Sequence, residues 1–143
     1  MKVSTRTRYG IRAAIELALH YNQGPLQLRI IAERQQISVK YLEQLVAVLR
    51  SGGIVRSLRG AKGGYLLAKA PDQVRMSDIF RCLEGTVVAS NAIDPEAHAG
   101  RSGDHVAQQL WAQVETAVNK VLESVTLQDL LEQAGDGAEN YQI

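Results

Sequence analysis

Apolar residues in the N-terminal part of the chain recur at helical spacing and predict three helices, over residues 6–22, 26–36 and 39–51. Gly24-Pro25 ends the first helix, and Gly52-Gly53 ends the third. Ser38 is a suitable N-cap for the third helix. The third helix turns Leu42, Leu45, Val46 and Leu49 inward, since they lie at i, i+3, i+4 and i+7. This leaves an outward face for a partner, made of Lys40, Glu43, Ala47 and Arg50.

Beyond residue 53 the pattern changes from helical to strand-like. Residues 54–58 and 65–68 are rich in β-prone side chains, and residues 59–64 between them carry three glycines and two cations. This predicts a β-hairpin with a basic tip. Two short helices joined by a brief turn and followed by a hairpin are typical of a winged helix-turn-helix, in which the second helix enters the DNA major groove.

The rest of the chain is predicted to be helical apart from one irregular segment. We expect helices over residues 76–83, 104–125 and 126–133, and a loop over 85–103, which is polar and lacks a sustained period. The predicted fold class is therefore mainly α with a small β-hairpin wing. Its parts are a winged helix-turn-helix region, a linking helix with a sensor-type loop, dimerisation helices and a flexible tail, over residues 1–70, 71–103, 104–134 and 135–143 respectively.

The long helix over 104–125 carries a wide apolar stripe that needs a cover. We expect it to pack on its two-fold mate in a homodimer. The alternative is that it covers the core of its own chain. The predicted dimerisation residues are Leu110, Trp111, Val114, Val118, Val121 and Leu122.

Composition is that of an ordinary globular domain, with 143 residues, 45% hydrophobic and 22% charged. Neither a membrane span nor a signal-peptide pattern is found, so we expect a cytoplasmic protein without a membrane partner. The net charge of +1 is the sum of a cationic N-terminal half and an anionic C-terminal half. Residues 1–69 hold 12 Lys/Arg against 3 Asp/Glu, whereas residues 70–143 hold 4 against 12. A cationic half is typical of a binder of double-stranded DNA; the alternative is that it complements the acidic half within a dimer or a partner.

Several separated motifs together resemble one family. They are MKVSTRTRY at residues 1–9, IAERQQIS at 31–38, YLEQL at 41–45, RGAKGGY at 59–65, LEG at 83–85 and TLQDL at 126–130. This series is similar to the Rrf2 family of bacterial transcription regulators and covers nearly the whole chain. The resemblance implies a homodimeric winged-helix protein that binds a palindromic operator and represses or activates neighbouring genes, with repression as our expectation.

The resemblance also implies which residues face DNA. The helix that begins after Ser38 matches the recognition helix, and Arg59 to Gly64 match the wing. From the chemistry of the side chains, Lys40 can reach a phosphate or guanine, Glu43 a cytosine amino group and Gln44 an adenine. As alternatives, Glu43 is a solvated surface residue and Gln44 packs against the first helix. The predicted DNA contacts are Arg8, Ser38, Lys40, Tyr41, Glu43, Gln44, Arg50, Arg59, Gly60 and Lys62.

Many relatives hold an iron–sulfur cluster on three cysteines of the loop. Here the matching positions hold Asn91, His98 and His105, while Arg8 and Gln108 stand where some relatives have the fourth ligand. With one cysteine in the chain, we expect no conventional cysteine-ligated iron–sulfur cluster, and we predict no cofactor. Two interpretations of the loop remain. Either the sensing site has been lost, or His98 and His105, aided by Asp94, Glu96 or Asp104, bind a different metal or ligand.

Three further predictions concern the single cysteine, a protein partner and catalysis. Cys82 falls on the apolar face of a predicted helix and is expected to be a core residue, with a redox switch as the alternative. A regulatory protein partner docking on the acidic half is the second function considered. An enzyme is not expected, because no catalytic triad order, phosphate-binding loop or HExxH motif is present.

Overall fold

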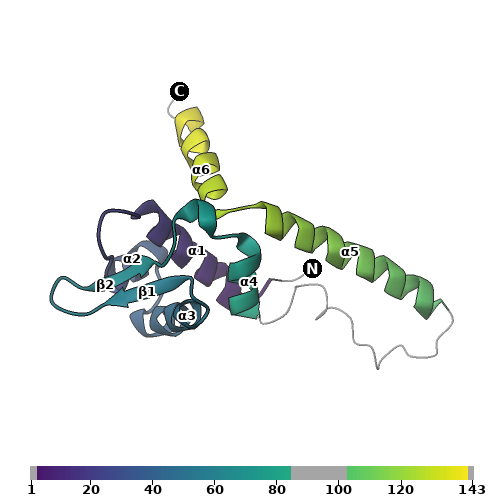
Figure 1. Ribbon diagram of the computed structural model, residues 1–143, viewed down its shortest axis with the longest axis horizontal. Helices are drawn as coiled ribbons and strands as arrows, with labels where there is room; N and C mark the ends of the chain where they lie inside the picture. The colour runs from purple at the N-terminus through teal and green to yellow at the C-terminus, as the bar shows by residue number, and fades with distance from the viewer. Residues whose placement is uncertain (1–2, 85–102, 142–143) are drawn as a thin grey trace.

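The computed structural model describes residues 3–84 and 103–141, with residues 136–141 described as backbone only. Its body is a helix-turn-helix with a hairpin, and two further helices leave it (Figure 1). The elements run α1 Thr5–Leu19, α2 Leu28–Gln35, α3 Val39–Ser51, β1 Val55–Leu58, β2 Gly64–Leu67, the 3-10 turn η1 Pro71–Gln73, α4 Met76–Glu84, α5 Asp104–Ser124 and α6 Leu127–Tyr141. The expected mainly helical fold with a two-stranded wing is confirmed. Within the described residues, no helix is long and apolar enough to cross a membrane.

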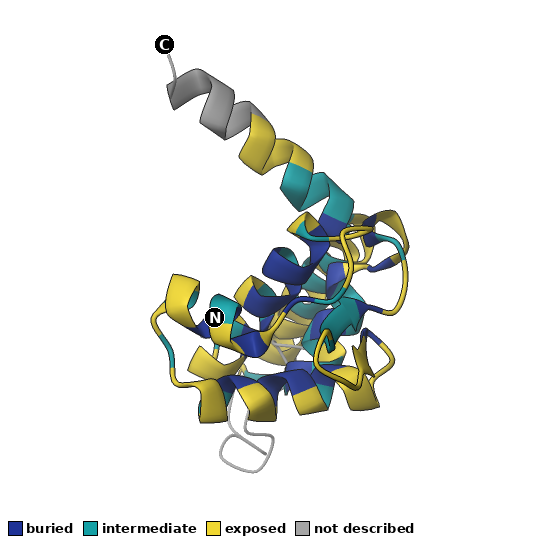
Figure 2. Ribbon diagram, turned by 90° about the vertical axis from the view of Figure 1, so that its left-hand side faces the viewer, coloured by how far each residue is buried: buried dark blue, intermediate teal, exposed yellow. Residues whose placement is uncertain are grey.

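The core lies where α1, α3 and α4 meet, and Val55 of β1 and Leu67 of β2 pack into it. Figure 2 shows buried residues along the helix faces that meet in the body and exposed residues on the outer faces. The four inward residues predicted for α3 are at most 2% exposed. Gly10 allows α1 to approach α4 closely, because a Cβ at this position would lie 2.5 Å from the Leu83 side chain.

Three element boundaries differ from the sequence-based expectation. The first helix ends at Leu19, three residues early, and Tyr21 lies exposed beyond it. The second helix begins at Leu28 because Leu26 is held in a β-bridge, so its backbone is already extended. The last helix continues to Tyr141, beyond the expected end at residue 133 and into the segment expected to be a flexible tail.

A carboxylate at the end of α4 anchors the start of α1. Glu84 Oε1 accepts hydrogen bonds from Thr7 Oγ1 at 2.6 Å, Ser4 Oγ at 2.8 Å and the Ser4 backbone N at 3.2 Å. These bonds, from Thr7 first and then Ser4, hold the pKa of the Glu84 carboxyl below its ordinary value because they stabilise the charged form. Ser4 is also the N-cap of α1. The carboxylate therefore joins two helix ends that lie 77 to 80 residues apart in the sequence.

The junction between α5 and α6 is fixed to the start of α4. Met76 N donates to Val125 O at 2.8 Å, and Leu127 N donates to Val74 O at 3.0 Å. Thr126 and Asp129 form a reciprocal capping box, with N–O distances of 2.9 and 3.1 Å. The base of α6 is thus part of the body, since Leu127 is fully buried.

Candidate nucleic-acid interface

Helix α3 presents an exposed polar face. Ser38 caps it as predicted, with its Oγ accepting from Tyr41 N at 3.1 Å. Lys40, Glu43 and Gln44 are all exposed, and no hydrogen bond or ion pair engages their side chains within the described part of the chain. Gln44 is therefore a surface residue. The inward face of the same helix is buried, so the polar face must point outward.

The turn between α2 and α3 is fixed by a contact that the sequence analysis missed. The Glu16 carboxylate on α1, 9% exposed, accepts from Arg34 Nη1 at 3.0 Å and from Gln35 Nε2 at 2.9 Å. Gln36 then adopts a left-handed conformation, with φ of 54°, and reverses the chain. The Arg34 side chain is nevertheless 58% exposed, so it bonds to Glu16 while facing outward. A signal for Glu16 was available, because an acid at i+3 from Ala13 falls on the buried face of α1.

The hairpin forms a wing whose tip carries the predicted cations. Strands β1 and β2 pair antiparallel from Val55↔Leu67 to Leu58↔Gly64, and Arg59, Gly60 and Lys62 are exposed at the tip. Gly60 has φ of 113°, which favours glycine, and its carbonyl accepts from Gly63 N at 3.0 Å. The tip is therefore a tight, defined turn that sets the positions of two cations.

Two contacts fix the wing relative to the helices. Leu26 and Tyr65 exchange backbone hydrogen bonds of 2.9 Å each, so the segment before α2 forms a bridge with β2. At the other side, Arg50 Nη1 donates to Ser57 Oγ at 3.4 Å. Arg50, predicted as a DNA contact, thus lies at the end of α3 next to the wing, where it bonds to β1.

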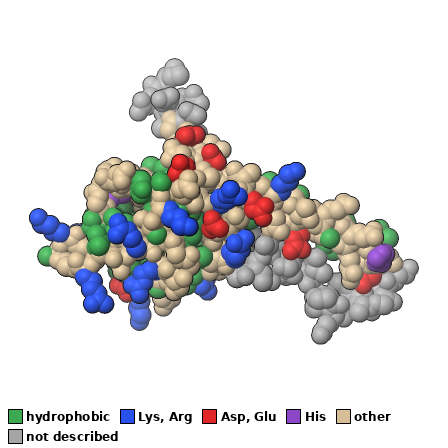
Figure 3. Space-filling view, viewed as in Figure 1, with side chains coloured by type: hydrophobic (Ala, Val, Ile, Leu, Met, Phe, Trp, Pro, Cys, Tyr) green, Lys and Arg blue, Asp and Glu red, His purple; other side chains and the backbone are tan. Residues whose placement is uncertain are grey.

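The first half of α1 lies against the start of α3. The rings of Tyr9 and Tyr41 meet edge to face, with centroids 6.2 Å apart, and the Arg12 guanidinium lies 5.3 Å from the Tyr9 ring centroid. Tyr41, predicted to face DNA, is half-buried beside this contact, whereas Arg8 is exposed on α1. The structure thus places predicted residues of α1, α3 and the wing on one body. Figure 3 shows Lys and Arg side chains over that body, while many of the visible acidic side chains lie around α5 and α6.

Most of the apolar stripe of α5 is uncovered. The helix extends away from the body (Figure 1), and Leu110, Trp111, Val114 and Val121 are 37% to 60% exposed. Val118 is half-buried, and Leu122 is half-buried where it packs against the core. The alternative that this helix covers its own chain's core thus holds only at its C-terminal end.

The described residues do not offer a thiolate site or a cluster of metal ligands. Cys82 is half-buried against Gly52, and burial, followed by the nearby Asp78 charge, raises the pKa of its thiol. This agrees with a packing role. His105 is exposed in the first turn of α5, with its Nε2 3.2 Å from Gln109 Nε2. His98, with Asp94 and Glu96, lies outside the described residues, and among those described no group of three His, Cys, Asp or Glu could hold a metal.

Comparisons with known proteins agree on one family. The family model for Rrf2, described as an iron-dependent transcriptional regulator, matches residues 3–133. The chain is 42% identical over 141 residues to the HTH-type transcriptional regulator CymR of Bacillus subtilis, covering 99% of this chain and 97% of that protein. It is 37% identical over 133 residues to the HTH-type regulator IscR of Erwinia tasmaniensis, covering 92% and 79% respectively.

Solved structures give the same result. The structure of CymR, the global cysteine regulator of B. subtilis, superimposes with a TM-score of 0.75 at 40% identity and covers 93% of this chain and 98% of that chain. The structure of IscR from T. potens gives 0.77 at 43% identity, covering 94% and 88%. These relatives are named transcriptional regulators and not enzymes, and DNA is the partner that their helix-turn-helix designation implies. The chain belongs to the Rrf2 family of DNA-binding transcriptional regulators.

Proposed function

We propose that the protein is a homodimeric repressor that binds a palindromic operator in the bacterial cytoplasm. The observation that carries this proposal is the exposed polar face of α3 beside a wing with a basic tip; within the described residues its Lys40, Glu43 and Gln44 side chains make no hydrogen bond or ion pair. In a two-fold dimer, two such helices would enter successive major grooves about 34 Å apart. Repression then follows from occupancy of the operator, because a bound dimer blocks the DNA it covers.

The residues of the interface have separable roles in this proposal. Glu43 and Gln44 read base edges, since a carboxylate accepts from cytosine and an amide pairs with adenine. Lys40 and the wing residues Arg59 and Lys62 contact phosphates, which supply affinity without sequence information. Ser38, Tyr41, Gly60 and Arg50 hold these groups in place through the cap, the ring contact, the turn and the Ser57 bond already described, and Arg8 adds charge from α1.

The dimer rests on the exposed stripe of α5. An apolar groove of about 290 Å³ runs along Ala117, Val118, Val121 and Leu122, and Trp111 is 45% exposed further along the helix. Contiguous apolar surface of this kind is typical of a protein interface. A second copy of the same helix supplies the complementary surface under two-fold symmetry, so the six predicted dimerisation residues face one another.

DNA binding is tested by its dependence on salt and on base sequence. With about six phosphates neutralised per complex, the slope of log K against log salt is expected near −5. Arg59→Ala should weaken binding to all sequences, whereas Glu43→Ala and Gln44→Ala should mainly change base preference on a panel of single-base operator variants. A flat salt slope, or unchanged preference in both α3 variants, would contradict the assignment of α3 as the reading helix.

A single cysteine does not provide the ligands of a conventional iron–sulfur cluster. Cys82 packs against Gly52 with a raised thiol pKa, and no second cysteine exists in the chain. We therefore propose that regulation does not use a cysteine-ligated cluster, even though the family model is described as iron-dependent. Anaerobic purification followed by absorption spectroscopy and metal analysis tests this proposal. A brown, sulfide-containing protein would overturn it, and stoichiometric metal without sulfide would favour a site that uses His98 and His105.

A regulatory protein partner is the second candidate. The observation in its favour is the exposure of acidic side chains on the elements that leave the body, including Glu123 on α5 and Glu132 on α6. Co-purification of one protein in a stoichiometric complex that changes operator affinity would support this function. An operator affinity that is identical in lysate and in purified form would argue against it.

A further inference from the structure

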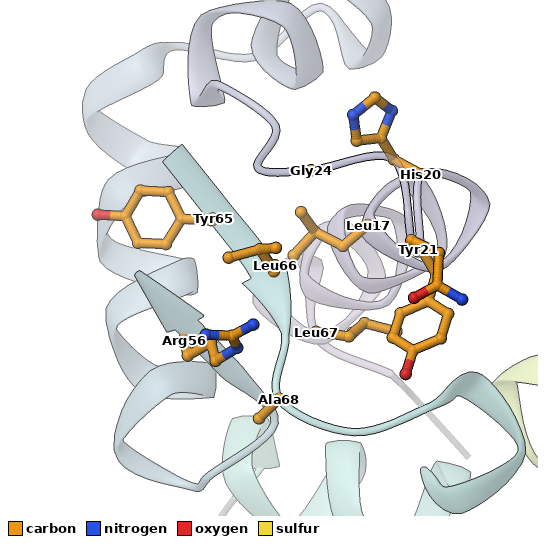
Figure 4. A pocket seen from close by; sticks show the side chains of 10 residues that line it. Leu17, His20, Tyr21, Gly24, Arg56, Tyr65, Leu66, Leu67 and Ala68 are labelled. Atoms are coloured by element: carbon orange, nitrogen blue, oxygen red, sulfur yellow. The ribbon is translucent and has the colours of Figure 1, made fainter. Parts of the chain in front are cut away.

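A cavity lies between the end of α1 and strand β2 of the wing. Its volume is about 140 Å³. Figure 4 shows His20 and Tyr21 at the end of α1 across from the hairpin that carries Arg56 and Leu66. None of the residues predicted to contact DNA lines this cavity.

The register of the hairpin divides the lining residues between its two faces. Ser57 bonds to Arg50 of α3, so its side chain points toward that helix. Tyr65 pairs with Ser57, and Arg56 pairs with Leu66. Because successive side chains of a strand point to opposite faces, Arg56 and Leu66 lie on the outer face, whereas Tyr65 and Leu67 lie on the other face. The cavity therefore borders β2 from both faces, and a ligand in it would not touch the residues predicted to contact DNA.

The lining combines an apolar floor with cationic and polar groups. Leu17 and Leu67 are buried at the floor, and His20, Tyr21 and Arg56 supply an imidazole, a phenol and a guanidinium. None of the lining residues is acidic. The ion pairs within the described residues are Arg34–Glu16 and Arg81–Asp78, so no carboxylate of that part of the chain neutralises Arg56.

The guanidinium, the apolar floor and the volume of the cavity together indicate which class of ligand it can bind. An uncompensated guanidinium forms its best hydrogen bonds with a planar, bidentate carboxylate. The leucine floor favours a short hydrocarbon body attached to that group. A cavity of this size is close to the roughly 150 Å³ that accommodates benzene, so the occupant has about six heavy atoms.

We propose that this cavity binds a small monocarboxylate, with the carboxylate on Arg56 and its hydrocarbon body against Leu17 and Leu67, and that binding changes the affinity of the wing for DNA. The effect on DNA affinity rests on the proposed function, whereas binding of the carboxylate does not. The coupling has a short path. Arg56 lies three residues before Arg59 on the same strand and turn, so a ligand that fixes Arg56 also restricts the wing tip. By linkage, DNA must change the affinity for the carboxylate by the same factor.

Calorimetric titration with matched probes tests the site itself. Butanoate is expected to bind the full chain with a Kd on the order of 1 mM, as suits a ligand of six heavy atoms. Butanamide, a neutral probe of the same shape, should bind at least tenfold more weakly. Arg56→Gln should abolish the preference for butanoate, while Arg75→Gln, which removes another exposed arginine, should retain it. Equal affinity for both probes, no heat from butanoate at 50 mM, or full binding by Arg56→Gln would each overturn the site.

A second variant guards against indirect effects of removing Arg56. Ala68 lines the cavity, and Ala68→Phe fills it while leaving the guanidinium in place. This variant should fold, as judged by circular dichroism, and should bind neither probe. Retained butanoate binding in Ala68→Phe would show that butanoate interacts with Arg56 at the surface and not in the cavity, which would contradict the proposal.

Operator titrations with and without butanoate test the coupling separately. Saturating butanoate should change the operator Kd of the wild type at least threefold and leave that of Arg56→Gln unchanged, with sodium chloride at equal ionic strength as the control. If butanoate binds but the operator Kd is constant, the regulatory half is wrong and the site stands. If the protein fails to bind any DNA, the proposed function has failed, and the calorimetric result alone decides the site.

Discussion

Gly63→Ala provides a sharp test of the wing. A Cβ at this position would lie 2.9 Å from the Arg59 carbonyl carbon and from the Gly60 oxygen, and closer still to the Leu58 oxygen. All three atoms belong to the backbone, so no side chain can move aside to make room. The tip must therefore open, which breaks the 3.0 Å bond from Gly63 N to Gly60 O and moves the two cations.

The size of the effect follows from the two phosphate contacts expected at the tip. Each contact contributes about −0.9 to the slope of log K against log salt, so losing both should change a slope near −5 to one near −3. If the electrostatic contribution is taken to vanish near 1 M salt, the loss at 0.1 M is about 60-fold in affinity. Stability should fall by only about 1–2 kcal/mol, because the strain is local and the ladder from Val55↔Leu67 to Leu58↔Gly64 can persist.

Fluorescence anisotropy on a labelled operator, repeated from 0.05 to 0.3 M salt as roughly the range in which phosphate contacts dominate, measures both quantities. Gly135→Ala is the matched control. Its Cβ meets nothing within 4 Å, so it should stabilise α6 by up to about 1 kcal/mol and leave DNA binding unchanged. Wild-type affinity and slope in a folded Gly63→Ala protein would refute the role of the wing. A loss of affinity with an unchanged slope would refute the phosphate argument.

Three further predictions concern stability and assembly. Glu84→Gln should lower the free energy of unfolding by about 1 kcal/mol at pH 7, because charge-assisted bonds from Thr7 and Ser4 are weakened. The pKa of the Glu84 carboxyl is lowered in the folded state, so the extra stability of the wild type is present above the unfolded pKa of about 4.3 and is lost as pH falls through the folded pKa. A difference in unfolding free energy between the two proteins that persists at acid pH in urea titrations would contradict this. Leu42→Ala, at a fully buried site, should cost about 2–5 kcal/mol, and a loss below about 1 kcal/mol in the same assay would be inconsistent with the packing of α3. Val114→Glu should dissociate the proposed dimer, as measured by sedimentation velocity. Thr116→Glu, about 200° around the helix from Val114, should leave the dimer intact. If both variants had the same effect, the apolar stripe of α5 would not be the dimer interface.

Short-range features of the site could be read from the sequence because each depends on neighbours along the chain. The cap at Ser38, the inward phase of Leu42 and the strand pair around the glycine-rich tip all follow from local periodicity and turn chemistry. The capping box at Thr126 is of the same kind. In each case the partners lie within 12 residues of one another, so the local sequence specifies the geometry.

Contacts between distant segments could not be read in this way. Leu26 was assigned to a helix, yet the bridge to Tyr65 overrides its local preference. The periodicity of α1 places Glu16 on its buried face, yet it does not reveal that Arg34 of another helix is the partner. Periodicity identifies which face of an element is buried but not which element covers it.

The sequence by itself determined that this chain is a mainly helical DNA-binding regulator with a helix-turn-helix and a basic wing, because these depend on local patterns and on motifs shared with its family. Only the tertiary structure decided how α1, α3 and the wing are held together, that Glu84 ties the end of α4 to the start of α1, and that a cavity opens between the end of α1 and strand β2 of the wing. The physical reason is that these features depend on the distances between segments far apart in the sequence. Such distances follow from how the whole core packs.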